Sequence, residues 1–215
     1  MYAAFFDLDH TILSISSGRI MFKSSYEHGI IGRMDILKAM LFNLLYRTGL
    51  MSPEGAAKRW LMCYRDMSVE MFVPIAAEWA EELKRYIRDD ARKEILDHKN
   101  NGAKTVILSA STTVFCELTK NVLGMDDVIC TELELVDGIL TGEMKGRYCY
   151  GQEKLVRARQ YCHEQGLRMK DAYYYADSIA DLPVMEAVGT PVCVTPDKRL
   201  EREALKRGWK ISHWK

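Results

Sequence analysis

Phe5-Phe6-Asp7-Leu8-Asp9-His10-Thr11, close to the start of a 215-residue sequence, is an apolar run that ends abruptly in charge. The run Ala-Ala-Phe-Phe is continuous rather than alternating, which is typical of a strand buried on both faces of a parallel sheet. Polar residues just beyond the carboxyl end of such a strand lie where open α/β sheets bind ligands. We therefore predict a ligand site that includes Asp7, Asp9 and Thr11.

An Asp-x-Asp pair also occurs in calcium loops and in surface turns. An EF-hand loop would follow a helix, and it would continue with another aspartate or asparagine and end in a glutamate at the twelfth position. Here the third such position is Thr11, and the preceding residues have the character of a strand. The pattern therefore favours a functional site over a structural turn.

The composition indicates a globular protein with one large core and a smaller appended unit, because 48% of the residues are hydrophobic and 28% are charged. Thirty basic and thirty acidic residues cancel, so there is no electrostatic footprint for nucleic acid and no basic tail for an anionic membrane. The most apolar helical segment, 36–46, contains Lys38 and Asn43 and is too short to span about 30 Å of hydrocarbon. We expect a soluble protein with no nucleic-acid or membrane partner.

The cysteine pattern indicates a reducing compartment. No Cys-x-x-Cys pair occurs, and most of the cysteines have apolar neighbours, as expected of reduced core residues in a cytoplasmic protein. The six residues are Cys63, Cys116, Cys130, Cys149, Cys162 and Cys193. A signal peptide is not expected, because Asp7 interrupts the first apolar run.

A block of helical periodicity follows the first strand and continues to about Arg88. The predicted helices are 17–31, 33–47, 53–67 and 69–87, with Ser52-Pro53 and Ser68 as helix-start signals. Methionines and aromatic residues recur along these helices at helical spacing, and we interpret them as the core of a helical bundle. They are Met21, Phe22, Met40, Phe42, Trp60, Met62, Met71, Phe72 and Trp79.

From Asp89 onward, predicted helices and strands alternate, which implies a parallel sheet with crossover helices. The predicted elements are helix 89–101, strand 105–108, helix 112–123, a strand and hairpin over 128–144 that turns at 136–138, helix 152–165, strand 172–176, helix 182–188, strand 192–194, helix 197–207 and strand 209–212. The predicted fold class is α/β, with a doubly wound, Rossmann-like parallel-sheet core over 1–15 and 89–215. The helical block, 16–88, is predicted to be a cap domain inserted into that core.

Polar residues also follow other predicted strands of the core. Ser109-Ala110-Ser111 opens a helix and could bring backbone N–H groups to an anion, although this stretch taken alone favours a simple serine N-cap. Asp177 and Asp181 follow strand 172–176 and could form a hard-cation site with Asp7. Lys154 lies near a helix start, where helices usually prefer acidic residues, but lysines on helix surfaces are common.

Four features of the sequence resemble, in their order along the chain, the four motifs of the haloacid dehalogenase (HAD) superfamily of phosphatases. They are Asp7-x-Asp9-x-Thr11, Ser109, Lys154 and Asp177-x-x-x-Asp181. Two further features resemble subfamily IB of this superfamily, the phosphoserine phosphatase-like group. One is the helical insertion after the first motif, which resembles a cap of the C1 type, and the other is the sequence Asp-Ser-x-x-Asp-Leu-Pro in the fourth motif. The resemblance covers essentially the whole chain. It implies a Mg²⁺-dependent phosphoric monoester hydrolase that acts on a small phosphorylated metabolite. It leaves open whether the protein is a monomer or a dimer.

The resemblance also implies a role for each matching residue. Asp7 would be the nucleophile that forms an aspartyl-phosphate, Asp9 the general acid and then the base, and Lys154 the cation that balances their charge. Thr11 would support the loop, Ser109, Ala110 and Ser111 would provide the phosphate site, and Asp7, the Asp9 backbone carbonyl, Asp177 and Asp181 would serve the metal.

Three departures from the phosphoserine enzymes bear on the substrate. Ser16 stands where those enzymes place an acidic residue for the substrate ammonium, Ser109-Ala110-Ser111 replaces a Ser-Gly-Gly-like motif, and Ala180 replaces an asparagine. Substrate choice is expected in the cap, where the candidate residues are Ser17, Arg19, Lys23, Tyr26, Arg59 and Arg65.

Other functions remain open at this point. A receiver-like phospho-acceptor module would keep its aspartyl-phosphate as a signal, but it would need neither a leaving-group acid nor a large cap. A dehalogenase would not use an acid two positions after its nucleophile, so Asp9 argues against that chemistry. A phosphotransferase and an inactive binding protein are the remaining alternatives.

Overall fold

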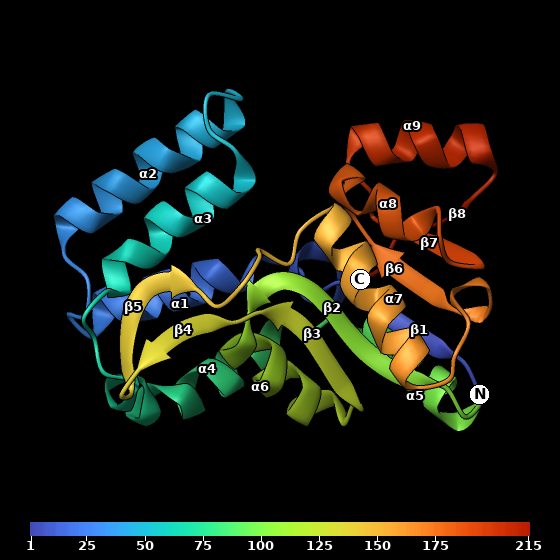
Figure 1. Ribbon diagram of the computed structural model, residues 1–215, viewed down its shortest axis with the longest axis horizontal. Coiled ribbons are helices and arrows are strands. Elements are labelled where there is room, and N and C mark those ends of the chain that lie inside the picture. The colour runs from blue at the N-terminus through green and yellow to red at the C-terminus, as the bar shows by residue number, and fades with distance from the viewer. The chain divides into compact units, whose positions relative to one another are not determined.

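The computed structural model describes residues 1–215, with the exception of the side chain of Arg47. The chain forms two compact units (Figure 1). The first, here called the sheet unit, comprises Met1–Ser17, Leu83–Thr131 and Cys149–Lys215. The second, the insert unit, comprises Gly18–Glu82 and Glu132–Tyr148.

The sheet unit contains a six-stranded parallel sheet in the order β3-β2-β1-β6-β7-β8. The strands are β1 (Ala3–Phe6), β2 (Lys104–Thr112), β3 (Asp127–Thr131), β6 (Tyr173–Ala176), β7 (Thr190–Val194) and β8 (Lys210–Ser212). The chain builds outward from β1 through β2 to β3, and then returns to the other side of β1 through β6. This reversal makes the crevice between β1 and β6 the topological switch point, where doubly wound sheets bind ligands. The predicted fold class is therefore confirmed.

Helices flank both faces of this sheet. They are α5 (Asp89–Asn100), α6 (Thr113–Leu123), α7 (Gln152–Glu164), α8 (Leu182–Met185) and α9 (Lys198–Arg207). Side chains of α7, α8 and α9 share one buried cluster with Phe5 and Tyr174. On the opposite face, Phe6 stacks on Tyr175 with ring centroids 4.5 Å apart, and His98 of α5 lies 2.7 Å from the Tyr175 hydroxyl. Side chains alternate along a strand, so two consecutive residues within β1, or within β6, point to opposite faces of the sheet.

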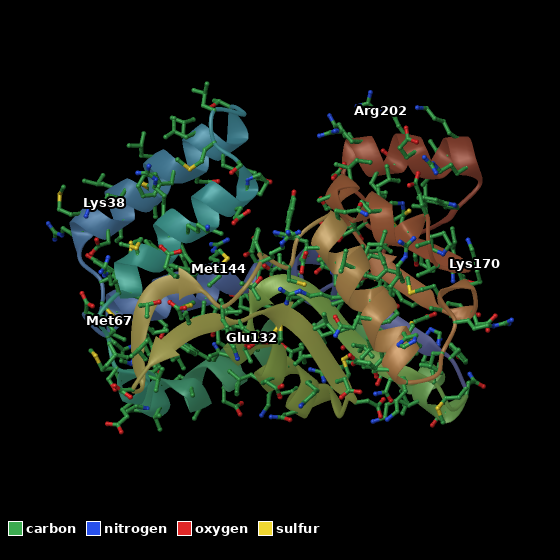
Figure 2. The ribbon with its side chains drawn as sticks, viewed as in Figure 1. Lys38, Met67, Glu132, Met144, Lys170 and Arg202 are labelled. Atoms are coloured by element: carbon green, nitrogen blue, oxygen red, sulfur yellow. The ribbon has the colours of Figure 1, made fainter. Side chains whose placement is uncertain are left out.

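The insert unit is mainly helical but includes a β-hairpin. Its helices are α1 (Ser17–Glu27), α2 (Arg33–Arg47), α3 (Pro53–Leu61) and most of α4 (Val73–Tyr86), with short 3-10 turns at Met62–Tyr64 and Val69–Phe72. The hairpin consists of β4 (Leu133–Val136) and β5 (Ile139–Met144). Figure 2 shows Glu132 and Met144 at its open end.

This hairpin turns at the predicted position, because Asp137 and Gly138 both adopt positive φ angles that two-residue hairpin turns require. The hairpin belongs to the insert unit, whereas the sequence-based division assigned only residues 16–88 to the cap domain. The physical reason is backbone pairing: Leu140 donates to the Met67 carbonyl and accepts from Asp66, both at 2.8 Å.

Several sequence-based boundaries differ from the structure. Helix 17–31 ends at Glu27, before Gly29 with its φ of 68°, and helix 53–67 ends at Leu61, before Asp66 with its φ of 64°. Positive φ angles are incompatible with a continuing α-helix. Helix 69–87 begins as a 3-10 turn, and helix 182–188 ends at Met185.

The interpretation of the helical methionines as core was wrong for three of them. Met21, Phe72 and Trp79 are buried, but Met40, Met62 and Met71 are 65%, 42% and 49% exposed. Among the described residues, no helix is both long and apolar enough to cross a membrane.

Candidate active site

The backbone beyond β1 places Asp7 at the switch point. Its N–H donates to the Tyr175 carbonyl at 2.9 Å, which continues the pairing of β1 with β6 by one residue. The chain then makes a tight turn over Leu8–Ile12, in which His10 has a φ of 60°. Asp7 is therefore fixed at the end of a strand whose four residues are completely buried.

Lys154 joins the first and last predicted motifs. It enters from the first turn of α7, and its side chain is only 3% exposed. Its Nζ lies 3.0 Å from Asp7 Oδ1 and 2.7 Å from Asp181 Oδ1. Burial opposes the charged form, but Asp181 and Asp7 outweigh burial and hold the pKa of Lys154 well above its ordinary value. The ammonium is a fixed positive charge beside Asp7.

Three carboxylates converge at the same point. Asp7, Asp177 and Asp181 each offer one oxygen, and these three atoms lie within 4.8 Å of one another. Burial raises the pKa of Asp177 to about 8, and the charges of Asp7 and Asp181 add to this effect. Burial also raises the pKa of Asp181 to about 6, although Lys154 counteracts it.

This arrangement fits a hard divalent cation. Three carboxylates, of which Asp7 and Asp181 are buried and Asp177 is half-buried, lie beside one ammonium, so negative charge is in excess. Burial, together with the repulsion between these carboxylates, raises the pKa values of Asp177 and Asp181. Carboxylate oxygens are the ligands that Mg²⁺ and Ca²⁺ prefer in proteins. The acidic cluster expected from the sequence is therefore formed.

Asp9 points to a different set of partners. Its Oδ1 accepts from the Ser17 N–H at 2.7 Å, and its Oδ2 accepts from the Ser16 hydroxyl at 3.1 Å. Burial raises the pKa of Asp9, whereas the hydrogen bonds from Ser17 and Ser16 lower it. The net rise favours a protonated carboxyl that is already oriented. Sequence reasoning did not foresee these two serines as partners of Asp9.

The residues predicted for a phosphate site lie at the end of β2. Ser109 is buried and lies within the strand, so it is not the N-cap of α6, and its Oγ accepts from the Ser111 N–H at 3.2 Å. The Ala110 carbonyl accepts from Thr131 at 2.9 Å. The strand expected to end at Leu108 runs on to Thr112, with an irregularity in its pairing to β3 after Leu108.

Thr11 and Ser111 connect these segments. The buried Thr11 hydroxyl donates to Asp177 Oδ1 at 3.3 Å, so it links the turn after β1 to the end of β6. The Ser111 and Ser17 hydroxyls lie 2.6 Å apart. The first, second and fourth predicted motifs are thus brought together with Lys154 by contacts within the sheet unit.

Tyr174 is a site neighbour that sequence reasoning missed. Its hydroxyl donates to Asp181 Oδ1 at 2.8 Å and accepts from Lys154 Nζ at 3.1 Å. A buried tyrosine usually finds a partner for its hydroxyl, and this was the available signal. The strand pattern alone did not reveal which face Tyr174 occupies.

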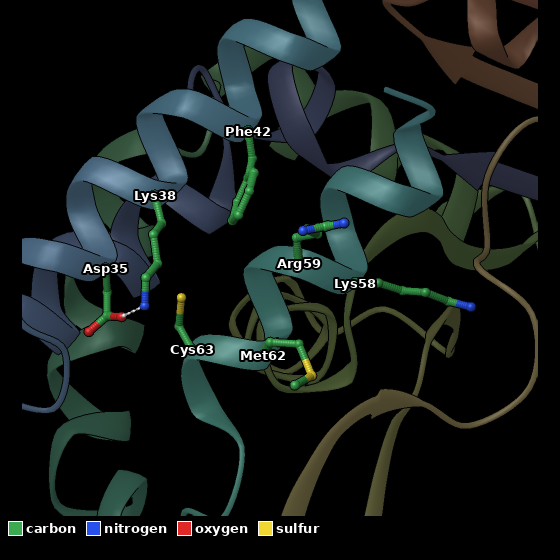
Figure 3. Close-up of a pocket in the computed structure, with 7 residues that line it drawn as sticks. All are labelled: Asp35, Lys38, Phe42, Lys58, Arg59, Met62 and Cys63. Atoms are coloured by element: carbon green, nitrogen blue, oxygen red, sulfur yellow. Dashed lines mark ion pairs between the residues drawn. The ribbon is translucent and has the colours of Figure 1, made fainter. Parts of the chain in front are cut away.

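A separate cavity of about 460 Å³ lies between α2 and α3 in the insert unit (Figure 3). It is lined by Asp35, Lys38, Phe42, Lys58, Arg59, Met62 and Cys63. The Arg59 guanidinium lies 5.5 Å from the centre of the Phe42 ring, and Lys38 forms an ion pair with Asp35 at 3.6 Å. Of the six residues proposed from the sequence for substrate choice, Arg59 lines this cavity.

Known proteins resemble this chain over nearly its full length. The inhibition of morphological differentiation protein of Streptomyces azureus is 34% identical, over 97% of this chain and 77% of that protein. A probable phosphatase of Mycobacterium tuberculosis is 32% identical, over 97% of this chain and 74% of that protein. A histidinol-phosphatase of Neisseria meningitidis is 27% identical, over 99% of this chain and 98% of that protein.

Solved structures share the fold. A protein of unknown function from Bordetella pertussis Tohama I matches with a TM-score of 0.86 and 27% identity, over 98% of this chain and 97% of the other. A substrate-bound phosphoserine phosphatase matches with a TM-score of 0.71 and 17% identity, over 96% and 97% of the two chains. The second match establishes the common fold alone.

The family assignment rests on the motifs, the topology and these relatives together. Residues 4–186 match the family of haloacid dehalogenase-like hydrolases, and this range contains every residue of the four motifs named from the sequence. The resemblance inferred from those motifs is confirmed. This chain therefore belongs to the haloacid dehalogenase-like hydrolase family of enzymes.

Proposed function

We propose that the protein is a Mg²⁺-dependent phosphatase that hydrolyses a small phosphate monoester through an aspartyl-phosphate on Asp7. The observation that carries this proposal is the buried Lys154 ammonium, 3.0 Å from Asp7 and 2.7 Å from Asp181, beside a cluster of carboxylates. Relatives named as a probable phosphatase and a histidinol-phosphatase support the same chemistry.

Asp7 needs positive charge around it to attack a phosphate dianion. A carboxylate and a dianion repel each other, and Lys154 supplies one fixed cation beside the Asp7 oxygen. Mg²⁺ would be held by Asp7, the Asp9 backbone carbonyl, Asp177 and Asp181, and when bound it supplies a second cation beside the Asp7 carboxylate. Attack by Asp7 then divides one difficult displacement into two easier ones.

Asp9 is suited to proton transfer in both steps. Burial favours its protonated form, so it can donate a proton to the departing alkoxide. The resulting carboxylate is stabilised by the hydrogen bonds from Ser16 and Ser17, and it can then accept a proton from the water that attacks the aspartyl-phosphate. Ser109, Ala110 and Ser111 would hold the phosphoryl oxygens, and Thr11 would keep Asp177 in place through its hydroxyl.

Substrate choice is proposed to reside in the insert unit, which keeps the role of the predicted cap domain, 16–88, with the added hairpin. All six cysteines are thiols outside any disulfide, and five of them are buried, which supports the cytoplasm as the proposed compartment.

The proposed function is tested by phosphate release from p-nitrophenyl phosphate and from a panel of phosphorylated metabolites, with Mg²⁺ and with excess EDTA. We expect turnover that requires Mg²⁺ and that is absent from the Asp7→Asn variant. Metal-independent turnover, or equal turnover by Asp7→Asn, would contradict the proposal. The panel also identifies the preferred substrate.

Removing a metal-facing charge is expected to affect Mg²⁺ more than removing a neutral hydroxyl near the phosphate. Asp177→Asn removes the negative charge of one carboxylate from the acidic cluster, whereas Ser109→Ala removes one neutral hydrogen-bonding group. The Mg²⁺ concentration for half-maximal activity should therefore rise clearly in Asp177→Asn and stay near the wild-type value in Ser109→Ala. Similar midpoints in the two variants would refute the metal assignment.

The metal-free protein is expected to become more stable as the pH is lowered from about 9 to about 6. The pKa values of Asp177 and Asp181, about 8 and about 6, lie above the ordinary value of 3.8, so the folded state binds more protons than the unfolded state in this range. Stability must then fall as the pH rises. Melting temperatures measured in EDTA should fall with rising pH, and saturating Mg²⁺ should make this dependence weaker. An equal pH dependence with and without Mg²⁺ would argue against Mg²⁺ binding at Asp177 and Asp181.

L-Phosphoserine is not expected to be the preferred substrate. Ser16 stands where the phosphoserine enzymes place a carboxylate, and its hydroxyl is engaged with Asp9. The missing contact to the substrate ammonium should cost roughly 1.5–3 kcal/mol, or about one to two decades in kcat/KM. The prediction fails if phosphoserine gives the highest kcat/KM of the panel.

A further inference from the structure

Tyr174 and Tyr175 are neighbours on β6, and their side chains lie on opposite faces of the sheet. Tyr174 is completely buried in the cluster that includes Phe5, Leu155 of α7 and Val184 of α8. Tyr175 points to the other face of the sheet, where its hydroxyl bonds to Glu94 at 2.6 Å and lies 2.7 Å from His98. The two side chains are therefore comparable in burial, but only Tyr174 contacts Lys154 and Asp181.

The contacts of Tyr174 complete the hydrogen bonding of the buried ammonium. A lysine ammonium has three N–H donors. Lys154 Nζ has three acceptors at bonding distance, namely Asp7 Oδ1, Asp181 Oδ1 and the Tyr174 hydroxyl. The Tyr174 hydroxyl in turn donates its proton to Asp181 Oδ1. One oxygen of Asp181 thus takes part in this contact, and its other oxygen does not.

We propose that Tyr174 is a positioning residue that holds the Lys154 ammonium and the Asp181 carboxylate in the orientation that the reaction at Asp7 requires. This inference rests on the proposed function. The lysine stem is flexible, and its ammonium is a point charge that could shift between two carboxylates. A third, rigid acceptor on β6 fixes that charge near Asp7. The same hydroxyl selects the Asp181 oxygen that faces Lys154 and thereby leaves the other available to a metal or its waters.

The competing explanation is that Tyr174 only fills the core. Tyr174→Phe separates the two explanations, because it keeps the ring and deletes the hydroxyl. Tyr175→Phe is the matched control: it deletes an equally buried, hydrogen-bonded hydroxyl from the next residue of the same strand, away from Lys154. A purely structural role predicts similar effects of the two substitutions on stability and no specific effect of Tyr174→Phe on turnover.

We expect Tyr174→Phe to lower kcat for p-nitrophenyl phosphate by roughly 10–100-fold, with KM changed much less, because residues behind the groups that hold a metal typically have effects of this size. The Mg²⁺ affinity, measured by isothermal titration calorimetry, should also fall. Tyr175→Phe should retain the wild-type kcat and Mg²⁺ affinity even if its melting temperature drops. Tyr174→Met is a second variant to use if Tyr174→Phe does not fold.

The experiment distinguishes failure of this inference from failure of the proposed function. If the wild-type protein shows no phosphatase activity, the proposed function fails, and the calorimetric comparison still tests the role of Tyr174. The inference is overturned if Tyr174→Phe matches the wild type in kcat and Mg²⁺ affinity. It is also overturned if Tyr175→Phe reduces both quantities as much as Tyr174→Phe does.

Discussion

Asp9→Asn is expected to lose turnover of alkyl phosphates by several decades, because general acid–base catalysis typically contributes 10²–10⁴-fold at each step. An amide cannot donate the proton that an alkoxide leaving group needs, and it cannot accept one from water. An aryl phosphate has a better leaving group, so the first step should suffer less with that substrate. The ratio of aryl to alkyl phosphate turnover should therefore rise in this variant.

The measurement is a comparison of kcat/KM for p-nitrophenyl phosphate and for the best alkyl substrate of the panel. Ser16→Ala is a useful companion, because it removes only one hydrogen bond to the Asp9 carboxyl and leaves the acid in place. It should show a much smaller loss. An Asp9→Asn variant whose losses are the same for both substrate classes would indicate that Asp9 does not protonate the leaving group.

Lys154→Met is expected to reduce kcat/KM strongly, because it removes the ammonium that contacts both Asp7 and Asp181. Removing one preorganised group that stabilises charge in the transition state typically costs about 2.7–4 kcal/mol, or roughly two to three decades in rate. The methionine is similar in length, so packing in α7 should be largely preserved.

The loss should appear in activity more than in folding when Mg²⁺ is present, because the metal would still neutralise part of the acidic cluster. Arg157→Met on the same helix is the matched control, since its side chain bonds to Glu153 and to the Cys130 carbonyl. Comparable losses of activity in Lys154→Met and Arg157→Met would show that the effect comes from the helix and not from the ammonium.

The sequence was sufficient to predict the sheet core and most of the acidic site. Asp7 and Asp177 both follow buried apolar strands, and the carboxyl ends of parallel strands meet at one edge of a sheet, so their proximity follows from the pattern itself. Lys154 required the resemblance to the family, because a lysine near a helix start has no distinctive pattern. Its burial between two carboxylates became evident only in the structure.

Other features could not be predicted because they depend on contacts between distant segments. The hairpin pairs with residues 66–69, some seventy positions earlier, and its own sequence carries no signal of that partner. Helical spacing indicated that Met40 shares a face with other apolar residues, but not that this face is exposed. The face of β6 that Tyr174 occupies is set by the packing of α7 and α8 against the sheet.

The central claim is that Asp7 carries the phosphoryl group during the reaction. The most direct test is the intact mass of Asp9→Asn after incubation with p-nitrophenyl phosphate and Mg²⁺, followed by peptide mapping of the modified residue. The account predicts an adduct of about 80 Da on Asp7, because Asp7 can still attack and no base remains to release the phosphate. The adduct should be absent from the Asp7→Asn/Asp9→Asn double variant. Contradiction would come from turnover without any adduct on Asp7, or from a long-lived wild-type adduct whose lifetime Asp9→Asn leaves unchanged, as a receiver-like module would show.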